Sequence, residues 1–127
     1  MEIREERMAP HLLKVHLGGR GVVHYMTAPD HGDPHDHPWP FVSTILTGGY
    51  IEEVFAHDGT SELVHRRPGD RFTIGAGHIH RIVELPEGEC LTFIIPGEAE
   101  RKPGFYQWRD GVMWSRRWDE GEFTPHG

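Results

Sequence analysis

The sequence predicts an all-β sandwich or barrel, and three observations support this prediction. The 127-residue chain contains about ten short runs rich in β-branched and aromatic residues, at regular spacing and without helical periodicity. Turn residues are abundant, because 16 Gly and 10 Pro make up roughly a fifth of the chain, against about an eighth in average proteins. Arg71–Ile74 and Arg81–Leu85 alternate polar and apolar side chains, as expected for strands with one buried face.

The predicted strands are separated by turns of recognisable chemistry. Asp58-Gly59 and Asp110-Gly111 predict hairpin turns, because Asp-Gly supplies the positive φ angles that tight hairpins need. A polar, Pro-rich loop is expected over residues 28–40. The predicted strands are Leu12–Leu17, Val22–Thr27, Phe41–Thr47, Tyr50–Phe55, Leu63–Arg66, Arg71–Ile74, His80–Leu85, Cys90–Ile95, Phe105–Arg109 and Val112–Arg116.

Chain length predicts one domain over residues 1–127, with its core at about 12–116. We expect residues 1–10 to form a tail or a loosely attached edge, and residues 119–127 to form a loosely ordered tail.

Charge and composition exclude several classes of function. The formal net charge is −7, and a general nucleic-acid binder would need clustered Lys and Arg instead. The single cysteine, Cys90, excludes an internal disulfide framework and is expected to be a buried small hydrophobe. The sequence shows neither an apolar stretch of signal-peptide length nor a run of 18 apolar residues. We therefore expect a cytoplasmic protein that does not interact with membranes.

Eleven histidines stand out in this composition, and two of them are suitably spaced for metal binding. His35 and His37 lie two residues apart, so in an extended segment they point to the same side while Asp36 points away. Two imidazoles on one side can reach one ion at about 2.0–2.2 Å. A pair of surface loop histidines is the alternative interpretation.

A second cluster of glycines and a histidine favours metal binding over a pair of surface loop histidines. Gly69 is followed by Gly75-Ala76-Gly77 and then by His80. Together the two segments resemble the cupin superfamily. The first cupin motif places His-x-His before a Glu and a Gly, matched here by His35, His37 and Gly48/Gly49; the second is matched by Gly69, Gly77 and His80. Gly75 stands where the second motif usually has Pro. The segment from His35 to Phe41 is also similar to small cupins of bacteria and phages.

The resemblance implies a double-stranded β-helix, or jelly-roll barrel, over roughly residues 20–96. It also implies that His35, His37 and His80 hold a divalent transition metal. The motif's Glu position falls on Val42, which cannot coordinate. Three-histidine sites without that carboxylate are similar to those of the thiol dioxygenases among cupins, so Fe(II) is favoured, with Zn, Ni or Mn as other candidates. The same loss also occurs in cupins that have abandoned metal. A homodimer is a further expectation from the resemblance.

Other side chains are candidates for roles around this centre. His24, His78 and Tyr106 are possible acid–base residues, and Trp39, Arg71 and Arg81 are possible substrate-pocket residues. His24, together with His31 and Asp33, could also replace the missing ligand or hydrogen bond to a ligating histidine. For Trp39 and Tyr106, core packing is the competing interpretation, and for Arg71 and Arg81 it is a solvent-facing strand position.

The functional prediction is a metal-binding cupin of the non-haem iron dioxygenase type, acting on a small polar or anionic substrate. One alternative is a cupin isomerase, epimerase or dehydratase that works by His or Tyr acid–base chemistry. Another is a non-enzymatic module that binds a small ligand.

Overall fold

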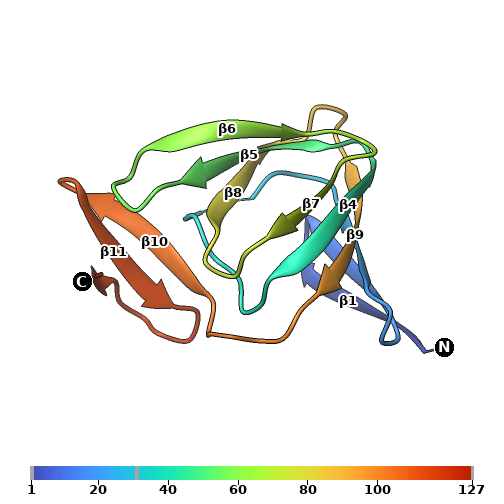
Figure 1. The fold of residues 1–127 in the computed structure, drawn as a ribbon, viewed down its shortest axis with the longest axis horizontal. Helices are drawn as coiled ribbons and strands as arrows, with labels where there is room; N and C mark the ends of the chain where they lie inside the picture. The colour runs from blue at the N-terminus through green and yellow to red at the C-terminus, as the bar shows by residue number, and fades with distance from the viewer. Residues whose placement is uncertain (1, 31, 127) are drawn as a thin grey trace.

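The computed structural model describes residues 2–30 and 32–126, which form β-strands and connecting loops (Figure 1). A six-stranded antiparallel sheet has the order β1-β2-β3-β9-β4-β7, and two three-stranded sheets have the orders β6-β5-β8 and β10-β11-β12. The strands are β1 (Ile3–Ala9), β2 (Leu12–Leu17), β3 (Val22–Met26), β4 (Phe41–Thr47), β5 (Tyr50–Phe55), β6 (Ser61–Arg66), β7 (Arg71–Ile74), β8 (Ile79–Glu84), β9 (Cys90–Pro96), β10 (Gly104–Arg109), β11 (Val112–Arg117) and β12 (Thr124–Pro125).

The predicted all-β fold is confirmed, and the predicted strands between residues 12 and 117 differ from the observed ones by two residues at most. Of the two expectations for residues 1–10, the structure shows the edge and not the tail, and the loosely ordered tail expected at 119–127 is corrected. Residues of β1 pair with β2 along its length, so this charged segment is the edge strand of the large sheet. Near the C-terminus, Thr124 and Pro125 pair with β11. Backbone pairing orders both segments although they carry little apolar patterning.

The core lies between the sheets in three apolar clusters. One surrounds Ile45, another surrounds Ile74, and the third joins Ile79 to Tyr106 and Met113. Cys90 is fully buried in the first cluster, as the sequence predicts. The third cluster holds the β10–β11 hairpin on the side opposite β1 (Figure 1). No helix in the described part of the chain is long and apolar enough to cross a membrane.

The turn after β4 explains the paired glycines of the first motif. Gly48 and Gly49 both have φ near +80°, which L side chains rarely adopt. A Cβ on Gly48 would lie 2.0 Å from the carbonyl oxygen of Glu89, so the turn also has no room for a side chain at this position. This tight turn joins β4, whose inner face lines the cavity described below, to β5, which carries Glu52.

Candidate metal centre

The first two histidines lie on an extended segment held between β8 and β10. His35 exchanges both backbone hydrogen bonds with His80, at 2.9 and 3.0 Å. On its other side the segment pairs with β10, because the Tyr106 amide donates to the carbonyl of Pro34 and the Asp36 amide donates to that of Gly104. Part of the loop predicted at 28–40 therefore has strand geometry, which explains why His35 and His37 point to the same side.

Asp36 points away from these histidines, as predicted, and fastens the segment to β10. Its buried carboxylate accepts hydrogen bonds from the Gly104 amide at 2.7 Å, the Tyr106 hydroxyl at 2.7 Å and Arg101 Nη1 at 3.0 Å. Arg117 Nη1 adds a charge contact at 3.9 Å. This network fixes the backbone that lies between the two histidines.

The structure brings His35, His37 and His80 together. One nitrogen from each ring lies within 4.8 Å of the others, and His80 Nε2 is 3.2 Å from His37 Nε2. The ring centroids are 4.8–5.5 Å apart and the rings meet edge to face. Three converging imidazoles are a donor set that zinc, iron, copper and nickel accept.

A buried carboxylate orients His80. Glu52, on β5, is fully buried, and its Oε1 lies 3.1 Å from His80 Nδ1 and 2.8 Å from His78 Nε2. Its second oxygen accepts from Arg66 Nε at 2.9 Å. An ionised carboxylate can only accept, so the Nδ1 atom of His80 is the donor and the lone pair of a neutral ring lies on Nε2, facing His35 and His37. A carboxylate behind a ligating histidine is the usual arrangement in metal sites.

The protonation states fit this arrangement. Burial alone would raise the pKa of Glu52, but hydrogen bonds from His78, His80 and Arg66 outweigh it and hold the pKa well below its usual value. Burial, followed by the charge of His80, lowers the pKa of His35 to about 4 and that of His37 to about 2. His35 and His37 are therefore neutral at pH 7, as metal ligands must be. His37 Nδ1 is buried without a hydrogen-bond partner among the described residues.

A second set of possible ligands adjoins the first. Glu52, His78 and His80 also place ligand atoms within 4.8 Å of one another. In this set the Glu52 carboxylate is already bound by Arg66, and its contacts with the two imidazoles have hydrogen-bond lengths. We therefore assign this group to the support of His80.

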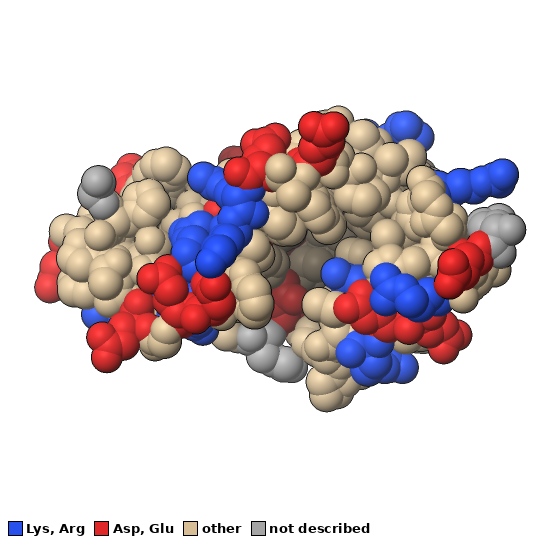
Figure 2. All heavy atoms as spheres, turned by 90° about the horizontal axis from the view of Figure 1, so that it is seen from below, with Lys and Arg blue, Asp and Glu red and all other residues tan. Residues whose placement is uncertain are grey.

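The three histidines line a cavity of about 380 Å³ between the large sheet and β5–β8. Its wall is largely apolar, with Trp39 and Phe41 beside the histidines. The surface seen in Figure 2 is hollowed near its centre. Such a volume is at the small end of the range for small-molecule sites, about 300–1,000 Å³.

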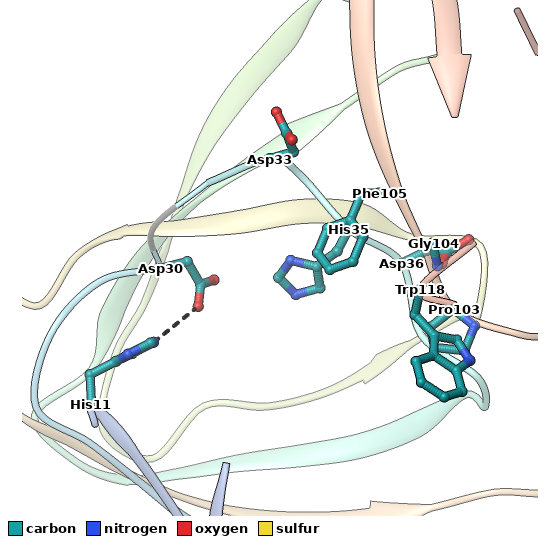
Figure 3. Close-up of a pocket in the computed structure, with 9 residues that line it drawn as sticks. All are labelled: His11, Asp30, Asp33, His35, Asp36, Pro103, Gly104, Phe105 and Trp118. Carbon is teal, nitrogen blue, oxygen red and sulfur yellow. Dashed lines mark hydrogen bonds and ion pairs between the residues drawn. The ribbon is translucent and has the colours of Figure 1, made fainter. Parts of the chain in front are cut away.

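A shallower pocket adjoins the cavity and shares Asp30, His35, Asp36 and Pro103 with it (Figure 3). Asp30 Oδ1 lies 3.8 Å from His11 Nε2, and its other oxygen accepts from the Ile82 amide at 2.8 Å. Phe105 and Trp118 line the side of His35 away from Asp30. His35 thus stands between an outer pocket and the inner cavity.

The pocket candidates from the sequence divide into two groups. Trp39 and His24 line the cavity, and burial lowers the pKa of His24 to about 3. Arg71 and Arg81 are corrected, because neither is among the described residues that line it. Arg71 is exposed at the start of β7, and Arg81 forms an ion pair with Glu53 at 2.9 Å on the other face of β8.

Tyr106 needs correction as well, and Val42, at the motif's Glu position, lies away from the centre. Tyr106 is buried in the core beside Met113 and donates to Asp36, so it is a packing residue rather than a cavity residue. On β4 the inward residues are Phe41, Ser43 and Ile45, and Val42 lies on the opposite face. Val42 therefore forms no wall of the cavity, because strand parity turns it outward.

Three further candidates have different positions. His78, a candidate acid–base residue, lies behind the centre and contacts Glu52 at 2.8 Å. The Asp33 carboxylate accepts a hydrogen bond from Gln107 Nε2 at 3.1 Å and points away from His35 (Figure 3). His31 lies outside the described residues.

Sequence reasoning missed three residues of the site: Glu52, Asp30 and Lys14. A signal existed for Glu52, because it shares the parity of Tyr50 on the predicted strand, whereas Glu53 has the opposite parity. A carboxylate on an inward face is costly unless it is paired. Asp30 gave no such signal, because it stands in the polar, Pro-rich segment. Lys14 is flanked by Leu13 and Val15 and shares the parity of Leu12 on the predicted strand, so a signal for an inward lysine existed.

Comparison with known proteins supports the fold. No protein-family model and no curated protein matches the sequence. Solved structures do match. Oxalate decarboxylase of Lactobacillus farciminis superposes with a TM-score of 0.60 at 16% identity, over 79% of this chain and 32% of that one. The cupin domain of Drosophila melanogaster CENP-C gives 0.58 at 11%, over 76% of both chains. KdgF of a Halomonas species gives 0.51 at 17%, over 77% and 89%.

These likenesses define the fold. The chain has the jelly-roll fold of the cupin superfamily, as its motifs predict. It spans about a third of the oxalate decarboxylase chain, and at these identities the likeness concerns the fold alone. Within that fold, three histidines and a buried glutamate form a candidate metal-binding site.

Proposed function

We propose that this chain is a metal-dependent cupin of the non-haem iron dioxygenase type, acting on a small polar or anionic molecule. His35, His37 and His80 would hold one divalent transition metal. The observation that carries the proposal is the convergence of three imidazole nitrogens within 4.8 Å beside a cavity, with Glu52 orienting one of them. The donor set fits the ion, because His35 and His37 are neutral at pH 7 and the contact of His80 Nδ1 with Glu52 leaves its Nε2 facing the cluster.

Ferrous iron is the metal we favour; zinc and nickel also suit imidazole ligands, and manganese is a further candidate. When bound, iron would supply a Lewis-acidic, redox-active centre with open positions for a substrate and dioxygen. The chain itself supplies the remainder. Glu52 keeps His80 in one tautomer, and Trp39 and Phe41 form an apolar wall beside the histidines.

Acid–base chemistry without a metal has weaker support. Tyr106 is buried in the core and bound to Asp36, and His78 is bound to Glu52. His24 does line the cavity, but with a pKa of about 3 its imidazole is a poor proton acceptor near neutral pH. The isomerase, epimerase or dehydratase alternative therefore lacks a well-placed base among these three candidates.

Metal content after purification without chelators tests the ligand assignment. We expect about one transition metal per chain in the wild type and at least a tenfold loss in both His35→Ala and His80→Ala. His65→Ala is the matched control, because His65 is exposed on β6, and it should keep the metal. Full retention of metal in both ligand variants would overturn the assignment.

Nitric oxide separates an oxygenase-type centre from a closed or structural one. Because it substitutes for dioxygen, it should bind to the iron-loaded wild type and produce a ferrous–nitrosyl absorption band. His65→Ala should behave the same way. An iron-loaded protein that produces no such band would exclude the dioxygenase proposal and leave a ligand-binding module.

A further inference from the structure

Some polar groups of the cavity wall have hydrogen-bond or ion-pair partners of their own, and others have none among the described residues. Asp36 and Asp30 both line the cavity, and both have partners of their own. Asp36 is bound by Arg101, Tyr106 and the Gly104 amide, and Asp30 by the Ile82 amide. Neither carboxylate therefore requires a cationic ligand.

Lys14 is the one ammonium or guanidinium group among the described residues that line the cavity. It lies on β2, where Leu12 shares its inward face, and it is in register with Glu6 on β1 and His24 on β3. No carboxylate oxygen in the described part of the chain forms an ion pair with it. Glu6, its nearest acidic neighbour in register, lies 2.8 Å from His16 Nε2 instead.

The surroundings of Lys14 leave its charge under-compensated. Burial lowers the pKa of this ammonium, and only the more distant charge of Glu6 opposes that effect. The charge of Lys14 also helps to lower the pKa of His24, so the two side chains lie close enough to interact electrostatically. A partly buried cation without a counter-ion is a site where an anion gains more than it does in water.

A second unsatisfied group faces the same space. Ser43 is only 1% exposed and lines the cavity from β4, and its hydroxyl has no hydrogen-bond partner among the described residues. Buried hydroxyls are normally paired, so this one is available to a ligand. Between these polar groups the wall is apolar, with Met26, Trp39 and Ile94.

We propose that the cavity binds small monocarboxylates with an apolar body, and that Lys14 is the residue that recognises the carboxylate. The apolar body would lie against Trp39 and Met26, with the Ser43 hydroxyl available to a second polar atom of the ligand. This inference deepens the proposed function, because it names the ligand class of the same cavity. The recognition of charge by Lys14 does not itself need the metal.

Benzoate and benzamide are suitable probes, since they share shape and differ in charge. Their affinities are measured by titration calorimetry at pH 7.5 on chelator-treated, metal-free protein. We expect the wild type to prefer benzoate at least tenfold, and Lys14→Met to lose that preference while still binding benzamide. Lys102→Met is the control and should behave as the wild type, because Lys102 is exposed and pairs with Asp119.

Lys14 and Lys102 are the only lysines in the sequence, which allows a test that needs no substitution. Both are converted to ¹³C-dimethyllysine, which keeps the charge, and are observed by NMR. Benzoate should shift the Lys14 resonance and leave that of Lys102 in place. This measurement tests whether Lys14 recognises the carboxylate even if Lys14→Met does not fold.

The inference is overturned by equal affinity of the wild type for benzoate and benzamide, by an undiminished preference in folded Lys14→Met, or by a Lys14 resonance that benzoate does not move. These outcomes are independent of the metal assignment, because the protein is metal-free throughout. Failure of the three-histidine site would appear instead as undiminished metal content in His35→Ala and His80→Ala.

Discussion

At the scale of single residues, the centre depends on one buried carboxylate. Glu52 has no exposed surface, yet it is held ionised by two imidazoles and one guanidinium. Its contact with His80 determines which nitrogen of that ring faces the other two histidines. The charge of Glu52 would therefore act on a bound metal through His80 and not by direct coordination.

Glu52→Gln tests this positioning role. We expect the zinc dissociation constant to rise about 10- to 100-fold, the usual cost of removing a partner behind a metal-ligating histidine. Competition with a chromophoric chelator measures it, at a temperature where circular dichroism shows the variant folded. Glu53→Gln is the matched control, because Glu53 is the next residue and pairs with Arg81 on the other face. Equal zinc affinity in the two variants would contradict the role of Glu52.

At the scale of elements, the extended segment around Asp36 joins the two halves of the site. It pairs with β8, which carries His80, and with β10, and Asp36 fastens it to the latter. The ligand geometry therefore depends on the docking of the β10–β11 hairpin, which is distant in sequence from His35 and His37.

Asp36→Asn tests this connection. The amide keeps one acceptor oxygen but loses the negative charge to which Arg101 and Tyr106 donate hydrogen bonds. We therefore expect a loss of about 2–3 kcal/mol in the free energy of unfolding. Urea denaturation of metal-free protein measures it. Asp33→Asn should change stability by less than about 0.5 kcal/mol, since Asp33 has one half-buried amide partner. A similar effect of both substitutions would show that Asp36 is not the anchor.

Local sequence signals predicted the strands and the three histidines well, because alternation, turn glycines and His-x-His spacing are properties of neighbouring residues. They failed where position depends on distant pairing. Arg71 and Arg81 were expected at the pocket, yet the register of β7 and β8 turns both away from it. Tyr106 belongs to a hairpin whose docking no local pattern encodes, and Lys14 reaches the cavity only because β2 lies beside β3.

At the scale of the whole molecule, the neutral histidines couple stability to pH. His24, His35 and His37 have pKa values of about 3, 4 and 2 in the fold, against about 6.5 in an unfolded chain. Between these values the unfolded state binds more protons than the native state. The contribution of these histidines to the free energy of unfolding is therefore fully present above pH 6.5 and is lost as the pH drops toward 4.

Chemical denaturation of metal-free protein at pH 7 and pH 5 measures this effect. We expect the free energy of unfolding to be about 2–4 kcal/mol lower at pH 5, a range discounted for partial exposure of the three rings. The carboxylates contribute little there, because Glu52 is ionised in both states until the pH falls below about 4.5. His24→Gln should reduce the loss, whereas His65→Gln should not. A pH-independent stability between 7 and 5 would contradict the assigned neutral states.

Metal position is the most direct test of the whole account. Crystals grown or soaked with zinc should give one strong anomalous difference peak at the zinc edge, about 2.0–2.2 Å from a ring nitrogen of His35, His37 and His80. Absence of that peak, or a peak coordinated by Glu52 and His78 in its place, would contradict the assignment of the three histidines as the metal ligands.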